Sequence, residues 1–256
     1  MLKVYQLIFQ QGYDFFIASK QLEFIIQRIH EFIFMLYNKD RVYAILVMDD
    51  KYKDLFNNIE ITLQEFKLDN KIFEQHIYAR LKYKQHYAIP FCLQVEPFLL
   101  YKILADYTYS NNSVPLAFFM HVYQRNERSS IASYLRKHDI KRTSIYYAYT
   151  DQIRAKLQAT HYHTTLLLAS NSKDTLMKGL SAFKASYFTY IIRSNNHKHE
   201  LIEQMLYKHI IHKPKRPLFN NQQYTVLSNI EIVSLMLPEV LLSIDGIRPY
   251  TTGAML

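Results

Sequence analysis

Apolar residues along this chain recur at the spacings of both helices and strands, and the clearest pattern covers residues 151–188. Ile153 and Leu157 recur at helical spacing, whereas Tyr162–Ser170 combines Tyr, Thr and Leu as a buried strand does. Ser172 is placed to cap a second helix. The apolar stripe behind it is Leu176, Leu180, Phe183 and Tyr187, while Arg154 and Lys156 lie off the stripe of the first helix. The pattern predicts helix, strand and helix, half of a split β-α-β layer.

The first 110 residues show a similar mixture of periods. Apolar steps of three and four residues after Ser19 predict one long helix over residues 19–36. Strands are expected on either side of it, at 1–9 and 41–48. The other predictions for this part are a strand at 58–67, a helix from 69 or 70 through 81, a short strand between Pro90 and Pro97, and a helix at 98–107.

The polar tract Ser110–Ser113 is the best candidate for a domain boundary, because a new strand is expected directly after it, at 114–123. Both parts begin with a strand and later show helix–strand–helix passages. We therefore predict an α+β fold of two ferredoxin-like lobes, with mixed or antiparallel sheets packed against helices. The predicted domains are a neutral lobe at 1–110, a basic lobe at 111–212 closed by a helix at 197–211, and a linker with a short capped helix at 213–256.

Glycine is scarce, and its scarcity argues against several classes of enzyme. The four glycines are isolated, whereas the phosphate-binding loops GxxxxGK[ST] and GxGxxG need glycines close together. We expect no nucleotide site, no cofactor and no catalysis in this chain. The single Cys92 allows no internal disulfide, and the longest apolar runs fall well short of the ~20 residues that cross a bilayer. A cytoplasmic location is expected, at the inner face of a membrane if a partner holds the chain there.

The net positive charge comes entirely from the second part of the chain. Residues 1–110 carry 13 Lys and Arg and 13 Asp and Glu, whereas residues 111–256 carry 18 and 9, so the whole net charge of +9 lies there. A basic lobe beside a neutral one suits a polyanion, most commonly nucleic acid, although a solvated lysine-rich surface has the same composition.

One basic stretch, Arg125–Arg142, is followed by the aromatic residues Tyr146, Tyr147 and Tyr149. Cations beside aromatic rings suit single-stranded nucleic acid, which is bound by charge and base stacking. The alternative is a solvated helix followed by tyrosines of a sheet. The candidate DNA contacts are Arg136, Lys137, Lys141 and Arg142 here, and Lys213, Lys215 and Arg216 in the linker.

Three other groups of residues suggest chemistry. Asp49 and Asp50 could share a cation, but adjacent carboxylates also begin helices, and a helix cap is the preferred interpretation. Cys92 has apolar neighbours, which would keep its thiol protonated. The pairs His161/His163, His197/His199 and His209/His212 lack the nearby Cys or acids of usual zinc sites, so no metal is assigned.

A family resemblance appears after the basic linker, in Tyr224–Pro238, YTVLSNIEIVSLMLP. Ser228 is placed to cap a short helix, Glu231 is its capping-box acid, and Pro238 follows its end. This segment resembles one in FtsK/HerA-like conjugative DNA-transfer ATPases, the type IV secretion coupling proteins, where it joins an N-terminal α+β region to the motor. The matching residues are Leu227, Ser228, Glu231, Ile232, Leu235 and Pro238. The order of elements from residue 114 onward is similar as well.

The resemblance implies a non-catalytic accessory or assembly region of a DNA-transfer ATPase, whose motor would lie beyond residue 256. The expected partners are DNA bound without sequence preference, the motor or other subunits, further copies of the chain, and a membrane-bound component. One alternative is a plasmid-type replication initiator or another DNA-binding protein. A second alternative is a metal-dependent nuclease that uses Asp49, Asp50 or the histidines.

Overall fold

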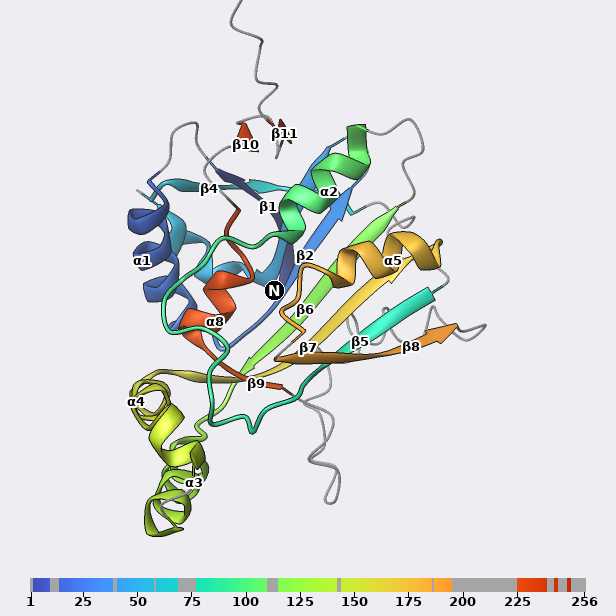
Figure 1. The fold of residues 1–256 in the computed structure, drawn as a ribbon. Coiled ribbons are helices and arrows are strands. Elements are labelled where there is room, and N and C mark those ends of the chain that lie inside the picture. The colour runs from blue at the N-terminus through green and yellow to red at the C-terminus, as the bar shows by residue number, and fades with distance from the viewer. Residues whose placement is uncertain are drawn as a thin grey trace, which may run out of the picture.

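The computed structural model describes residues 2–9, 14–38, 41–57, 59–68, 77–109, 115–141, 144–185, 187–194, 225–238, 242–243 and 248–249. Helices pack on an antiparallel sheet of nine strands, so the α+β class is confirmed (Figure 1). The strands of this sheet are β1 (Leu2–Phe9), β2 (Glu31–Asn38), β3 (Val42–Asp49), β4 (Ile61–Glu65), β5 (Ile77–Tyr83), β6 (Leu116–Gln124), β7 (His161–Ser170), β8 (Phe188–Ser194) and β9 (Thr225–Ser228). The helices are α1 (Phe15–Ile26), the 3-10 helix η1 (Asp50–Phe56), α2 (Leu100–Tyr109), α3 (Arg128–Lys141), α4 (Ser144–Gln158), α5 (Lys173–Leu180) and α8 (Asn229–Ser234). A separate pair joins β10 (Leu242–Ser243) to β11 (Arg248–Pro249).

The strand order β4-β1-β3-β2-β6-β7-β5-β8 contains the same arrangement twice. From β1 to β4 the chain runs strand, α1, strand, strand, η1, strand, and the sheet order from the outer edge is fourth, first, third, second. From β5 to β8 it runs strand, α2, strand, the inserted helices α3 and α4, strand, α5, strand, with the same sheet order from the opposite edge. Each half is therefore a split β-α-β arrangement of the ferredoxin-like kind.

The two ferredoxin-like units share one sheet because the second strand of each, β2 and β6, pair antiparallel. Phe34 lies opposite Met120, and Met35 lies opposite Phe119. The second unit starts at β5, so β5 and α2 precede the polar tract at 110–113 that marks the predicted boundary. Strand pairing, which the chain order does not reveal, puts β5 beside β7 and β8.

Helices α1, α2, α5 and α8 lie on one face of the sheet (Figure 1). On β2, Phe32, Phe34 and Leu36 join the hydrophobic cluster beneath these helices. The alternate residues Ile33, Met35 and Tyr37 are buried in a second cluster on the opposite face. Central strands with apolar residues on both faces appear in the sequence as uninterrupted apolar runs.

This double burial explains why the predicted long helix is wrong beyond its first half. Asp14, not Ser19, caps α1, accepting hydrogen bonds from the backbone N–H groups of Phe16 and Ile17, and the helix ends at Ile26. Residues 31–38 form β2, because a run apolar at every position satisfies helical and strand spacing equally. The helix predicted from 69 or 70 through 81 is wrong for residues 77–81, which belong to β5, while 69–76 lie outside the described residues. Residues 91–96 form no strand.

Other predictions from local sequence are confirmed. Ser172 caps α5, and Ser228 caps α8. The strand expected over Tyr162–Ser170 is β7, and the strand expected at 114–123 is β6. The tyrosines after the basic stretch lie in α4, not in a sheet. The helix predicted at 197–211 lies outside the described residues.

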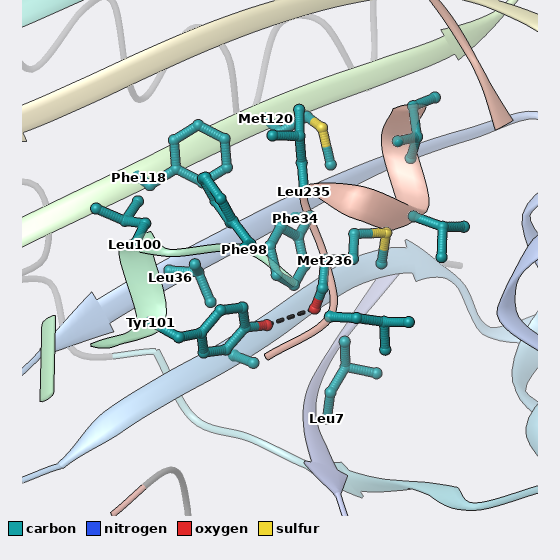
Figure 2. Close-up of a cluster of buried hydrophobic side chains, with 14 of the residues drawn as sticks. Leu7, Phe34, Leu36, Phe98, Leu100, Tyr101, Phe118, Met120, Leu235 and Met236 are labelled. Atoms are coloured by element: carbon teal, nitrogen blue, oxygen red, sulfur yellow. Dashed lines mark hydrogen bonds between the residues drawn. The ribbon is translucent and has the colours of Figure 1, made fainter. Parts of the chain in front are cut away.

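The segment after α8 fills the core where the two units meet. Figure 2 shows Leu235 and Met236 against Phe34 of β2 and Met120 of β6. The Tyr101 hydroxyl of α2 donates to the Met236 carbonyl at 2.5 Å, and the Phe98 N–H donates to the Leu237 carbonyl at 2.9 Å. Residues 225–238 are therefore built into the domain. None of the described helices is long and apolar enough to cross a membrane.

Candidate functional site

The most distinctive feature of the second unit is a helical hairpin, the α3–α4 arm (residues 128–158), inserted between β6 and β7. In the first unit, β2 and β3 are joined by only three residues, 39–41. Figure 1 shows the arm extending away from the sheet, beyond the ends of β6 and β7. Because the first unit completes the same fold without it, the arm is an addition to the fold and a candidate for function.

The arm is basic. Between residues 128 and 158 the sequence has seven Lys and Arg and two Asp. Arg136 and Lys137 are exposed, and neither has an ion-pair partner among the described residues. Arg154 on α4 lies 3.6 Å from Asp151, and both side chains are largely in solvent. An exposed ion pair of this kind is weak. Arg136 and Lys137 of the basic stretch thus lie on an exposed part of helix α3, whereas the tyrosines after the stretch lie in α4.

Other predicted contact residues are only partly placed. Lys141 is the last residue of α3, and only its backbone is described. Arg142, Lys213, Lys215 and Arg216 lie outside the described residues. The structure thus places Arg136 and Lys137 together on one helix and does not relate the linker cations to them.

A small apolar cluster fixes the base of the arm to the loop after β5. Ile131 of α3 and Ile153 of α4 are fully buried against Ala88 and Ile89. His86, in the same loop, stacks on the ring of Tyr134 with centroids 3.6 Å apart. The Asn126 side chain accepts from the Arg128 N–H at 3.0 Å and starts α3. The arm therefore leaves the sheet in a defined direction.

The strongest attachment is a buried ion pair between Lys156 of α4 and Glu231 of α8. Their charged atoms are 2.8 Å apart, and both side chains are 0% exposed. Glu231 Oε2 also accepts from the N–H and the hydroxyl of Ser228, each at 2.8 Å, while Oε1 accepts from the Phe91 N–H at 2.9 Å. Lys156 makes a second bond, to the Val226 carbonyl, at 2.9 Å. The pair thus joins α4 and α8 to β9 and to the backbone at Phe91, and its polar atoms have the further hydrogen bonds that a buried ion pair requires.

Sequence reasoning found one half of this pair. The spacing predicts Glu231 as a capping-box acid, and the capping box with Ser228 is present. The apolar stripe of Ile153 and Leu157 predicts Lys156 on the solvated side of the helix, which is wrong because its side chain is fully buried. Its spacing of three residues from Ile153 and seven from Tyr149 is the signal that could have placed it on the buried face. The remaining matching residues, Leu227, Ile232 and Leu235, are buried in the main core, and Pro238 follows them.

The two histidines of β7 belong to the same region. His161 Nε2 donates to the Lys156 carbonyl at 2.7 Å, and His163 Nε2 lies 2.7 Å from Glu127 Oε1. Burial is the main cause that lowers the pKa of both imidazoles below the ordinary value, opposed at His163 by Glu127. These histidines have structural partners, and His197, His199, His209 and His212 lie outside the described residues.

The residues of the enzymatic alternatives also have structural partners. Asp49 caps η1 by accepting from the Lys51 N–H at 3.2 Å, and Asp50 binds the Tyr5 hydroxyl and Lys3. Cys92 is buried beside Ser234, and burial raises the pKa of its thiol, so it stays protonated. Within the part of the chain that the structure describes, no group of three or more His, Cys, Asp and Glu could hold a metal ion.

Comparisons with known proteins identify no family for this chain: no family model matches it, and no curated protein matches it significantly.

Proposed function

We propose that this chain is a non-catalytic accessory and assembly region of a conjugative DNA-transfer ATPase, and that its α3–α4 arm contacts DNA phosphates. In the coupling proteins that the sequence resembles, the segment matching Tyr224–Pro238 leads to the motor. The proposal places further subunits or a membrane-bound component around the ferredoxin-like body.

The observation that supports it best is the different environment of the arm's cations. Lys156 forms a buried ion pair with Glu231 that fixes the arm, whereas Arg136 and Lys137 are exposed on α3 and have no ion-pair partner among the described residues. A rigid support that presents unpaired cations to solvent suits backbone contact without sequence reading, because phosphates are recognised by charge and position.

The anchored C-terminal segment supports the assembly role. Glu231, Leu235 and Met236 are fully or almost fully buried, and α8 begins directly after β9, which pairs with β7. The base of the arm and the segment expected to lead toward a motor therefore meet at one ion pair, Lys156–Glu231. A load applied to either would be transmitted to the other through this contact.

The test is fluorescence anisotropy with a labelled 30-mer, single-stranded and duplex, between 50 and 200 mM NaCl. If all seven candidate cations contact phosphate, affinity falls about a thousandfold for the single strand and roughly 6,000-fold for the duplex over this range. The double variant Arg136→Glu/Lys137→Glu should reduce the slope of log Kd against log salt by about 2 and weaken binding at 50 mM at least ~10-fold. The matched control is Lys53→Glu/Lys102→Glu, which reverses two exposed cations far from the arm.

Three results would contradict the proposal. The first is no binding at 50 mM NaCl, and the second is equal loss in the arm variant and its control. The third is a strong preference for one defined sequence in competition assays, which would favour a replication initiator. Divalent-metal-dependent cleavage of the labelled strand, abolished by Asp49→Ala, would favour the nuclease.

A further inference from the structure

The two outer edges of the sheet are formed by equivalent strands with different surfaces. β4 and β8 are the fourth strands of their units, and each pairs with one other described strand, β1 and β5 respectively (Figure 1). Equivalent positions in one fold provide an internal comparison, because the backbone demands on both strands are the same. A difference in their exposed side chains is therefore not imposed by the fold.

The β4 edge is polar. Its exposed residues are Thr62, Gln64 and Glu65, and Glu65 forms an ion pair with Lys3 at 3.1 Å. Charged and polar side chains are the usual protection of an exposed edge, since unpaired backbone groups otherwise recruit another strand. β4 therefore has the composition of an edge that stays in solvent.

The side chains of β8 that are described as exposed are Thr189, Tyr190 and Ile191, so this edge is more apolar than β4. Tyr190 and Ile191 are 40% and 41% exposed, and neighbouring Met177 of α5 is 39% exposed. The Tyr190 hydroxyl points to the Met177 sulfur at 3.7 Å, so these two side chains form one continuous surface. The only charged residue of the strand is Arg193, near its end. This edge lacks the protection that β4 has.

We propose that β8 pairs antiparallel with β8 of a second copy of this chain, so that the sheet continues across a two-fold axis. The chain already joins two ferredoxin-like units in this manner at β2 and β6. The proposal names the surface for the self-association included in the proposed function, but it does not require the arm to bind DNA.

The sequence of β8 is self-complementary in such a pair. A two-fold axis normal to the sheet puts residues of the same face opposite each other, so the axis passes at Ile191 or at Tyr190. With the axis at Ile191, Tyr190 faces the partner's Ile192, and Arg193 faces the partner's Thr189. Aromatic and β-branched pairs stabilise antiparallel strands, and the two arginines lie at opposite ends, without repulsion. The contact is isologous and closes as a dimer.

The experiment is sedimentation velocity of the full chain from about 2 to 100 μM in 300 mM NaCl without nucleic acid. The wild type should dimerise, and Ile191→Lys should raise the dimer Kd at least ~10-fold because it buries two like charges at the axis. Gln64→Lys, at an exposed position of β4, should leave the Kd unchanged. Both substituted residues are exposed, so circular dichroism should show native folding for all three proteins.

Cysteine cross-linking identifies the strand. Ile191→Cys or Tyr190→Cys, whichever lies at the axis, should form a disulfide-linked dimer under mild oxidation, whereas Gln64→Cys should not. A monomer at 100 μM, or equal dimerisation of wild type and Ile191→Lys, would overturn the proposal. Dimerisation without DNA binding would reject only the role of the arm, and DNA binding by a monomer would reject only the β8 interface.

Discussion

The Lys156–Glu231 pair allows the sharpest test of how the arm is held. Lys156→Met keeps the length of the side chain and removes its charge. It leaves the Glu231 carboxylate buried with three neutral donors and leaves the Val226 carbonyl without its lysine. A buried charge that has lost its partner costs about 3–5 kcal/mol, and the remaining hydrogen bonds put this variant near 3 kcal/mol.

Glu231→Gln should cost more, about 4 kcal/mol, because the Gln side chain has one accepting oxygen where the carboxylate has two. The NH2 group of the Gln side chain would face N–H or hydroxyl donors of Phe91 or Ser228. The charged Lys156 would remain buried with only the Val226 carbonyl as a partner. The double variant Lys156→Met/Glu231→Gln contains no buried charge, so its cost should be about 3–4 kcal/mol instead of the ~7 expected from the sum. The coupling energy is then about 3 kcal/mol.

The assay is urea unfolding followed by circular dichroism at 222 nm, since the chain contains no Trp. A loss of about 3 kcal/mol shifts the midpoint by about 1 M or more, at an unchanged slope. The control is Arg154→Met on the same helix, whose exposed pair with Asp151 should contribute less than about 0.5 kcal/mol. Equal effects of Lys156→Met and Arg154→Met, or an additive double variant, would refute the reasoning.

Three further predictions concern stability. Ser228→Ala removes the capping box and one donor to the buried carboxylate, so the free energy of unfolding should fall by about 1–2 kcal/mol in the same urea assay. Gly179→Val should cost about 2–3 kcal/mol, because a Cβ at this position would lie 2.8 Å from Leu168 Cδ2 and 2.9 Å from Leu116 Cδ2. Burial lowers the pKa of His161 and His163, so the unfolded chain binds more protons near pH 6.5; stability is fully present above this value and falls as the pH drops through it. The double variant His161→Gln/His163→Gln should therefore flatten the dependence of the urea midpoint on pH between 7.5 and 5.5.

Controls for these variants come from the same elements. Lys173→Val places the same side chain in the exposed first turn of α5 and should change stability by less than ~1 kcal/mol. A Gly179→Val protein as stable as Lys173→Val would contradict the close packing of α5 on the sheet. An unchanged pH profile in the histidine variant would show that other groups control the acid sensitivity, and a neutral Ser228→Ala would contradict the cap.

Local signals in the sequence predicted the parts of the structure that depend on neighbouring residues. The caps at Ser172 and Ser228 and the capping-box role of Glu231 required only spacing, because a cap is completed within one helical turn. The α+β class and β7 followed from alternation and from β-branched and aromatic content. The basic stretch follows from charge alone, whereas a helix there is only one of two interpretations and the tyrosines after it lie in α4.

Tertiary structure decided whatever depends on contacts between distant residues. Residues 31–38 became a strand because β3 and β6 pair with them, although their own apolar run fits both periods. Residues 77–83 became a strand because β7 and β8 pair with them. The position of β5 in the second unit, and the Lys156–Glu231 pair across 75 residues, are likewise set by strand pairing and burial. The sequence by itself determined the class of fold and the chemistry of the arm. Only the folded chain decided which strands are neighbours and which charges are buried, because these depend on the free energy of the whole sheet and not on any single segment.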